Sequence, residues 1–552
     1  MVLAVLTGLA SLLAGGLLIH KLLRETDPLL IVSQGTLTAS LLLIGGGNWL
    51  SKPALLGCLL TLAALLAVTV KSESVKWVAL TRPGGLILGG ATLSLFLFTL
   101  YHQFRFLDTD NWFHEPIIAN MVSGLFPPVY PYLPWNEMDY HYGRDLLIAV
   151  LTPAKVDPLA TVWILNPILQ LSGFLGLFTS IRALTGSERQ GLLGAIMVYF
   201  GMCVGTRVGL VNAFDVYNGL AACLLFVLFH VLLRMLEHHR PVQWVFAAFL
   251  LGTYQLVYET FWGAVFIAGL MVAVRFLRGP KAWAALVITA VLALGLAAVE
   301  GGVFSSMVMR SNKFEASELD ALRKLHVSAT FPKKPFLKID VTTAEYMRIS
   351  SAYDFSLFRN LRPKRLESGP ISIFSTQFLY AFWLPVLLAP WSLYAVRGCR
   401  LGLAYWSFGA VSFLIPGMVG FGERWDVEYF RWEFGAAVGF AAAFGMGLGS
   451  VLDRYRSTLS VERHENGVIL KVKDPRSFLR WSLCWLIILA SLAPAQKLLN
   501  DAVIDTQKHG FKVLSPAAWR VQQPELKVTQ ADIEATSWLA ARLKAGDFTL
   551  TN

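Results

Sequence analysis

Ionisable residues gather directly after a long apolar segment, in the stretch FRFLDTDNWFHEP that begins at Phe104. Asp108 and Asp110 are two positions apart, and His114 follows Asp110 by four, which places Asp110 and His114 on one face if a helix begins there. A carboxylate at a membrane boundary can act as a general base toward a hydroxyl group. The simpler interpretation is that one aspartate caps the helix beginning near Trp112. Asp110, Asp108 and His114 are the catalytic candidates.

The same side chains also suit a divalent cation. Two carboxylates and an imidazole are ligands for Mg²⁺ or Mn²⁺, and the sequence leaves this alternative open. The five cysteines stand singly and form no CxxC pair, so they indicate neither a metal site nor a disulfide framework.

A second polar cluster, DYHYGRD, spans Asp139–Asp145. Its Asp139, His141 and Arg144 would line a pocket that meets a sugar and a lipid head group, because aromatic faces stack on sugars and a guanidinium grips phosphate in a fork. The alternative is that the tyrosines form an aromatic belt at the membrane interface. We take Asp139, His141 and Arg144 as substrate-binding candidates.

Three further charged residues join this substrate-binding group. Glu259 interrupts an apolar segment, and a carboxylate within a membrane indicates a functional site by default. Pairing of Glu259 with Arg207 or Arg424 is the structural alternative. Glu423 and Arg424 belong to the charged stretch GERWDVEYFRWE, where Arg424 and Arg431 are candidate phosphate contacts. Ion pairs within that stretch are the alternative.

The elements that must position these residues are membrane helices. The chain has 552 residues, of which 55% are hydrophobic and 15% charged, and its mean hydropathy is +0.56. Soluble proteins carry about 25% charged residues. Long uninterrupted apolar segments recur along the chain. They are typical of transmembrane helices, whereas a membrane barrel shows short segments of alternating hydrophobicity. We therefore predict an all-α polytopic membrane protein with about 14 transmembrane helices. The apolar segments are 2–19, 29–48, 54–70, 84–101, 159–181, 191–211, 217–236, 243–258, 260–274, 282–304, 375–396, 401–421, 432–452 and 479–496.

Charge then separates the connecting loops into two sets. The net charge of +11 comes largely from loops that carry Lys and Arg, such as those with Lys21, Arg82 and Arg278. The positive-inside rule assigns these loops to the cytoplasm, so the basic excess indicates orientation and not nucleic-acid binding. The acidic motif then faces outward from a cytoplasmic (inner) membrane. This assignment of alternate loops to opposite sides of the membrane requires 243–274 to be a hairpin of two helices, with the polar break YQLVYET in its middle.

The expected organisation follows from these segments. A helix-then-strand pattern in the polar tail looks like the opening of an α/β unit, and we place this tail outside the cytoplasm. The predicted parts are N-terminal helices in 1–101, a first large extracytoplasmic loop in 102–158, central helices in 159–304, a basic extracytoplasmic loop in 305–374, C-terminal helices in 375–496 and the tail in 497–552.

The motif residues carry a resemblance. The run DNWFH at 110–114, with PP at 127–128 and YHYG at 140–143, resembles a branch of polytopic membrane proteins with a YYY or YHY motif. That branch is similar in layout to the GT-C glycosyltransferases, which take a sugar from a polyprenyl-phosphate donor outside the cytoplasm. The resemblance implies a GT-C-like fold, Asp110 as the motif acid, and membrane lipids with a lipid-linked sugar as partners.

Two functions from different classes follow. The first is a lipid-linked sugar transferase in which Asp110, with Asp108, deprotonates the acceptor hydroxyl. The second is a non-catalytic GT-C-like scaffold or accessory subunit bound to other membrane subunits. A transporter is disfavoured, because the acidic residues cluster at one face and the chain shows no internal repeat.

Overall fold

The computed structural model describes most of the chain. The described residues are 2–69, 74–105, 111–130, 133–138, 140–153, 156, 158–204, 207–213, 218–238, 240–309, 337–338, 384–420, 430–455, 459–464, 467–472 and 474–509.

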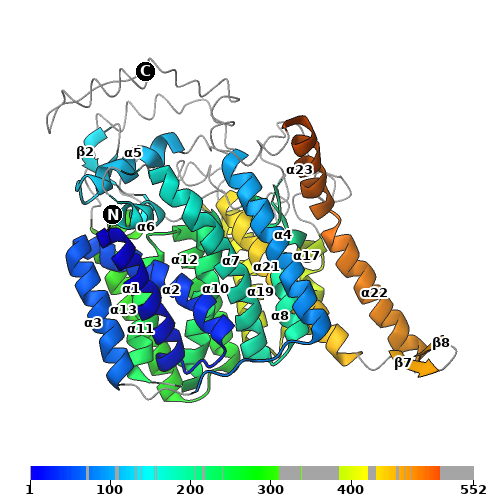
Figure 1. The fold of residues 1–552 in the computed structure, drawn as a ribbon. Helices are drawn as coiled ribbons and strands as arrows, with labels where there is room; N and C mark the ends of the chain where they lie inside the picture. The colour runs from blue at the N-terminus through cyan, green and yellow to red at the C-terminus, as the bar shows by residue number, and fades with distance from the viewer. Residues whose placement is uncertain are drawn as a thin grey trace.

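The described residues form a helical bundle with short two-stranded ribbons (Figure 1). The helices are α1 (Val2–Leu17), η1 (Leu18–Leu22), α2 (Pro28–Trp49), α3 (Lys52–Thr69), α4 (Arg82–Arg105), α5 (Asn111–Val122), α6 (Gly143–Leu151), α7 (Pro158–Thr185), α8 (Glu188–Ile196), η2 (Met197–Gly201), α9 (Gly209–Ala213), α10 (Asn218–His238), α11 (Pro241–Tyr254), α12 (Glu259–Phe276), α13 (Pro280–Val299), α14 (Gly302–Met309), α17 (Leu384–Leu387), α18 (Ala389–Val396), α19 (Arg400–Met418), α21 (Phe430–Arg454), α22 (Pro475–Leu492) and α23 (Ala495–His509).

The strands pair locally, with one exception. β5 and β6 join distant parts of the chain in parallel, whereas the other three pairs are antiparallel. The strands are β1 (Val129–Tyr130), β2 (Leu133–Glu137), β3 (Cys203–Val204), β4 (Arg207–Val208), β5 (Leu337–Lys338), β6 (Val419–Gly420), β7 (Leu459–His464) and β8 (Gly467–Val472).

The protein is a polytopic helical membrane protein, as the hydropathy predicted. Within the described ranges, nine helices are long and apolar enough to cross a membrane, and α11 and part of α19 are shorter apolar helices. The predicted hairpin at 243–274 is confirmed, since α11 ends at Tyr254 and α12 begins at Glu259. The predicted number of about 14 spans stays a prediction.

One predicted span is wrong. The apolar segment 191–211 is not a single helix, because α8 and η2 end at Gly201 and the chain continues into the β3–β4 ribbon and α9. Gly209 explains the break: its φ is +69°, and a Cβ there would lie 2.1 Å from the carbonyl oxygen of Tyr199. Only glycine fits a backbone that turns so closely against its own helix. Hydropathy alone does not register this turn.

One end of the bundle collects basic residues and defines what we call the basic end. Lys21 Nζ donates to the Ala67 carbonyl at 2.7 Å and so joins the end of η1 to the end of α3. Arg182, near the end of α7, pairs with Asp27 in the α1–α2 link. Arg234 Nε of α10 donates to Glu25 in the same link. The loops that the sequence grouped by charge therefore meet at one end.

The opposite end, which we call the histidine end, carries α5, the β1–β2 ribbon, α6 and the α11–α12 turn (Figure 1). It also carries the first residues of α1 (Figure 1). The predicted extracytoplasmic loop at 102–158 thus shares an end with Glu259.

Close helix packing holds this arrangement. A Cβ on Gly439 of α21 would lie 2.5 Å from the backbone nitrogen of Gly409 in α19, so the two backbones touch. Small residues permit such contacts between membrane helices, where dispersion forces and not the hydrophobic effect drive association. This contact positions α21 so that its first turn reaches the histidine end.

Candidate functional site

The first pair of the site joins α5 to α6. His114 Nδ1 lies 2.6 Å from Asp145 Oδ2, and both side chains are buried. Arg144 Nη1 lies 3.8 Å from Asp145 Oδ1. The two helices meet because Asp145 falls in the first turn of α6, where the helix dipole favours a carboxylate. A buried pair of this kind fixes the first turn of α5, which begins directly after Asp110 in the sequence.

A close backbone approach brings α6 to the α11–α12 turn. The backbone N–H of Gly143 donates to the carbonyl of Leu256 at 2.7 Å. A Cβ on Gly143 would lie 2.9 Å from the carbonyl carbon of Leu256, so any larger residue would push the two segments apart. The contact places His141 beside Glu259, although 118 positions separate them in the sequence.

The second group is a triad of His141, Glu259 and Arg431, which we call the histidine-end triad. His141 Nδ1 lies 2.9 Å from Glu259 Oε2. Arg431 Nη1 donates to Glu259 Oε1 at 2.5 Å and lies 3.3 Å from His141 Nδ1. Because a guanidinium only donates, the shorter contact assigns the Nδ1 proton of His141 to the bond with Glu259.

Aromatic rings enclose the triad. Tyr140 stacks on His141 with ring centroids 3.9 Å apart, and the His114 ring lies 6.5 Å from Tyr140. The Arg431 guanidinium lies 5.1 Å from the Tyr140 ring centroid and 5.3 Å from that of Tyr258, and Arg431 also donates to the Tyr140 hydroxyl. Tyr140 therefore links the His114–Asp145 pair to the triad in one continuous cluster.

Burial controls the protonation of His141. Removal from water lowers the pKa of His141 to about 4, with the Arg431 charge acting in the same direction and Glu259 opposing it. At neutral pH the imidazole is therefore uncharged, and the triad carries one carboxylate and one guanidinium. A neutral imidazole that donates through Nδ1 keeps Nε2 as its acceptor nitrogen.

A third carboxyl group lies at the same end with different surroundings. Glu300 follows α13, and its backbone oxygen accepts from Asn48 Nδ2 at 2.7 Å and lies 3.0 Å from the Tyr142 hydroxyl. Thr253 Oγ1 donates to its Oε1 at 3.1 Å. Burial raises the pKa of Glu300 to about 8, so this group is a neutral acid at pH 7. Its hydrogen bonds tie the motif residue Tyr142 to α2 and α13.

The sequence predicted part of this cluster. The described structure brings together four of the site candidates: His114, His141, Arg144 and Glu259. The other five candidates lie outside the described residues: Asp108, Asp110, Asp139, Glu423 and Arg424. The predicted alternative partners of Glu259 are likewise not described, since neither the Arg207 nor the Arg424 side chain is among them.

Sequence reasoning missed three members of the cluster or their roles. Asp145 was part of a noted motif, but nothing in the sequence identified it as the partner of His114. Arg431, a candidate phosphate contact with ion pairing inside its own stretch as the alternative, pairs with Glu259 of α12. Tyr140, for which a place in an aromatic belt and stacking on a sugar were the two interpretations, stacks on His141. Only the position of Arg431 at the start of an apolar segment offered a signal for a buried charge.

The chemistry open to the described cluster is positioning and proton exchange. Among the described residues, no group of three or more His, Cys, Asp or Glu side chains has the arrangement of a metal site. Asp108 and Asp110 are not among them, so the cation alternative stays a prediction. The cluster can hold the entry of α5 rigidly and can present a neutral imidazole beside a fixed guanidinium.

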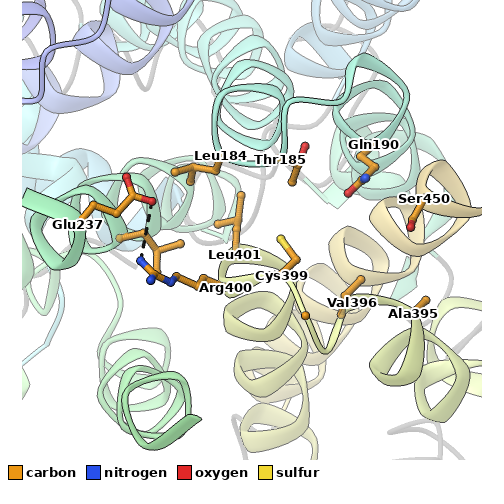
Figure 2. Close-up of a pocket in the computed structure, with 12 residues that line it drawn as sticks. Leu184, Thr185, Gln190, Glu237, Ala395, Val396, Cys399, Arg400, Leu401 and Ser450 are labelled. Carbon is orange, nitrogen blue, oxygen red and sulfur yellow. Dashed lines mark ion pairs between the residues drawn. The ribbon is translucent and has the colours of Figure 1, made fainter. Parts of the chain in front are cut away.

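A separate cavity lies at the basic end. Figure 2 shows this cavity, whose volume is about 440 Å³, between the ends of α7, α10, α19 and neighbouring helices. Arg400 Nη1 lies 3.9 Å from Glu237 Oε1 at its wall, so the two charges offset each other. Cys399 also lines it, at the turn between α18 and α19. None of the candidates from the sequence lines this cavity.

Two solved structures resemble this chain. Both are of oligosaccharyltransferases from Archaeoglobus fulgidus, and the first is the archaeal AglB. One, in complex with an inhibitory peptide and a dolichol-phosphate, has a TM-score of 0.44 and 14% identity, and the match covers 76% of this chain and 55% of that one. The other, tethered to an acceptor peptide, has a TM-score of 0.46 and 14% identity, with 83% and 58% covered.

This chain spans a little over half the length of either of these two chains. No protein-family model matches the sequence, and no curated protein matches it. Both TM-scores are below 0.5, so neither match carries an argument about function.

Proposed function

We propose that the protein is a GT-C-like membrane glycosyltransferase that transfers a sugar from a polyprenyl-phosphate donor at the extracytoplasmic face. Asp110 acts as the general base toward the acceptor hydroxyl, with Asp108 as the second candidate. The proposal takes its enzyme class from the resemblance at 110–145. The proposed side of the membrane follows from the separation of this motif from the basic residues, because the positive-inside rule assigns the basic residues to the cytoplasm.

The observation that carries the proposal is the continuous cluster at the histidine end. It joins two motif stretches, DNWFH and DYHYGRD, to Glu259 and Arg431 through buried contacts. Asp110 precedes the first residue of α5, and His114 anchors that helix to Asp145. Anchoring the helix fixes where the candidate base is attached, and a fixed base is what proton abstraction from a bound hydroxyl requires.

The roles of the remaining residues follow from charge. Arg431 is already paired with Glu259, so it positions the cluster and does not supply an open positive charge. Arg144, which lies 3.8 Å from Asp145 Oδ1, is the candidate for a phosphate oxygen of the donor because a guanidinium binds phosphate through paired N–H donors. Stabilising charge on the leaving phosphate lowers the barrier to transfer.

A specific observation also supports the scaffold alternative. His114, His141 and Asp145 are buried, and each carries a hydrogen-bonded partner within the protein. A cluster of this kind suits a purely structural role, in which it holds a rigid end of the bundle against another membrane subunit. The two functions differ in whether the aspartates of DTDNWFH do chemistry.

The deciding experiment compares Asp110→Asn and Asp108→Asn with Asp453→Asn, a matched change at the basic end. Cells that depend on each variant are scored for surface glycans, and the purified proteins are analysed by mass spectrometry for a retained polyprenyl-phosphate sugar. We expect Asp110→Asn to lose the glycan while retaining the lipid, and Asp453→Asn to keep both. An unchanged glycan profile in both motif variants would favour the scaffold.

Sidedness has its own test. In a Cys58→Ser background, Ser123→Cys and Arg278→Cys place thiols at exposed positions at the two ends. We expect a membrane-impermeant maleimide to label Ser123→Cys in intact cells and Arg278→Cys only after permeabilisation. The reverse pattern would place the motif in the cytoplasm and contradict the proposed donor.

A further inference from the structure

A second cavity at the basic end has an unusual charge content. Its volume is about 610 Å³, and it lies among the ends of α12, α18 and α21 and the first half of α22. Its lining includes four arginines and no carboxylate: Arg275, Arg397, Arg454 and Arg480. The cavity therefore gathers a net positive charge from helices that are distant in sequence.

Few charges oppose the four guanidinium groups. All four side chains are exposed, and no ion pair among the described residues involves any of them. The exposed carboxylate of Asp474, which is outside the cavity lining, attracts Arg480. Arg480 Nη1 donates to the Tyr455 hydroxyl at 2.9 Å, and Arg397 lies 4.2 Å from the Tyr394 ring centroid. These contacts orient two of the guanidinium groups without neutralising them.

The neighbouring cavity of Figure 2 provides the contrast. The two cavities share part of their walls at Gly398 and Ser450. In the cavity of Figure 2, Arg400 faces Glu237, whereas the four-arginine cavity has no such partner in its lining. The positive charge is thus a property of this cavity and not of every pocket at the basic end.

The other part of the wall is apolar. Leu483 and Ile487 of α22 and Trp391 of α18 line the cavity. α22 lies at the edge of the bundle (Figure 1), and its Leu486 and Leu489 are 62% and 63% exposed. The segment 479–496 is a predicted membrane span, and exposed leucines on such a helix are typical of contact with lipid chains. The cavity therefore combines a cationic mouth with an apolar side.

We propose that this cavity binds the head group of an anionic phospholipid, with one acyl chain lying along α22. Arginine recognises phosphate through paired N–H donors, and basic pockets between helices on the cytoplasmic side are suited to anionic head groups. The apolar wall selects a lipid over a free anion, because a soluble phosphate would leave that wall exposed. The site lies at the end opposite the histidine-end triad and is independent of the proposed transferase activity.

The test titrates the purified full-length chain with phosphatidylglycerol or phosphatidylcholine in detergent and counts bound lipid by native mass spectrometry. We expect phosphatidylglycerol to be retained in preference to phosphatidylcholine. Arg397→Gln combined with Arg480→Gln should weaken this retention about tenfold. The matched control, Lys76→Gln with Arg278→Gln, removes two exposed charges from the same end outside the cavity lining and should change nothing.

Three outcomes would overturn the proposal. Equal losses in the cavity and control variants would mean that lipid responds only to total charge. Binding of glycerol phosphate or inorganic phosphate as strong as that of the lipid would indicate a soluble-anion site. Equal retention of both lipids by the parent protein would exclude recognition of the head group. Thermal unfolding without anionic lipid verifies folding, and the single variants Arg397→Gln and Arg480→Gln replace any double variant that fails it.

Discussion

Two triads of the same residue types lie at opposite ends of the bundle. The histidine-end triad and its counterpart, which we call the basic-end triad, are His141–Glu259–Arg431 and His230–Glu25–Arg234. In the basic-end triad, Glu25 Oε1 lies 3.0 Å from His230 Nε2 and 2.6 Å from Arg234 Nε. Ser180 Oγ completes that network at 2.8 Å from His230 Nδ1.

The surroundings of the two triads differ. The basic-end triad joins the α1–α2 link to α7 and α10, and its second ring nitrogen is engaged by a neighbouring serine. The histidine-end triad lies against the rings of Tyr140 and Tyr258, and its His141 belongs to the motif stretch DYHYGRD. Identical residue types thus hold a loop in one place and form part of a candidate site in the other. The triads also differ in the ring nitrogen that faces the carboxylate, which is Nδ1 of His141 and Nε2 of His230.

The largest expected effect comes from breaking each triad at its carboxylate. Glu259→Ala removes the carboxylate that pairs with the buried Arg431, whereas Glu25→Ala leaves Arg234 with its second partner Glu237 and with a side chain that is 18% exposed. Removing one partner of a buried ion pair costs about 3–5 kcal/mol of stability. We therefore expect Glu259→Ala to lower the thermal unfolding temperature in detergent by more than Glu25→Ala does.

Activity per folded molecule then separates the two ends. Glu25→Ala should lower glycan transfer only in proportion to the folded protein that remains, whereas Glu259→Ala should abolish it. Equal activity per folded molecule in the two variants would show that the histidine-end triad is structural as well.

The next effect concerns a carboxyl group that has no cationic partner among its described hydrogen bonds. The pKa of Glu300 is raised to about 8 from an ordinary 4.5, so the folded state holds a proton that the unfolded state releases. The contribution of Glu300 to the free energy of unfolding is therefore fully present below pH 4.5 and is lost as pH rises through 8. Glu300→Gln should remove this loss and raise the unfolding temperature at pH 8.5 relative to the parent protein. A parent protein with equal stability at pH 6 and pH 8.5 would contradict the burial of a neutral acid.

A smaller effect is expected when arginine becomes lysine. Arg431→Lys keeps the charge but loses the fork that reaches Glu259 and Tyr140 and the stacking between two tyrosine rings. We expect a loss of about 2 kcal/mol, given roughly 0.5–2 kcal/mol for each ring contact. Arg234→Lys should cost less, because its side chain is 18% exposed whereas that of Arg431 is 5% exposed. The reverse order in urea or thermal unfolding would mean that the rings do not stabilise Arg431.

The smallest effect is a pH dependence that distinguishes the two ends. The pKa of His141 is lowered to about 4 from 6.5, so the unfolded state binds the proton first and stability falls as pH drops from 6.5 toward 4. Burial alone would raise the pKa of Glu25, but His230 and Arg234 outweigh it and lower it to about 2, so its contribution is lost only below pH 4.5. His141→Gln should therefore flatten the stability curve between pH 6.5 and 5 by about 1–2 kcal/mol. Glu25→Gln should leave the slope in this range unchanged.

Part of the fold was predictable from local patterns. The hairpin at 243–274 followed from the polar break between two apolar segments, and the charge of the loops sorted them to two ends that the structure confirms. The segment 191–211 was not predictable, because a Gly209 turn depends on backbone geometry against Tyr199 and leaves no mark in hydropathy. Local composition decides which segments are helical but not where a buried helix must turn.

Less of the candidate site was predictable. The motif stretches supplied His114 and His141, because clustered ionisable groups beside apolar segments stand out in any membrane sequence. The sequence did not show which residues pair with them. Glu259 and Arg431 are 172 positions apart, and each can be explained by its own neighbours in the sequence. Which cation pairs with a carboxylate depends on distances in the packed bundle, and the sequence alone does not give those distances.

By itself, the sequence determined a polytopic helical protein and the separation of its basic loops from its acidic motif, because hydropathy and charge act on each segment independently. Only the tertiary structure decided that His141 meets Glu259 and Arg431, and that four arginines from four segments surround one cavity. Those juxtapositions depend on which helices cross and how closely their glycines allow them to approach, and this is a property of the packed bundle as a whole.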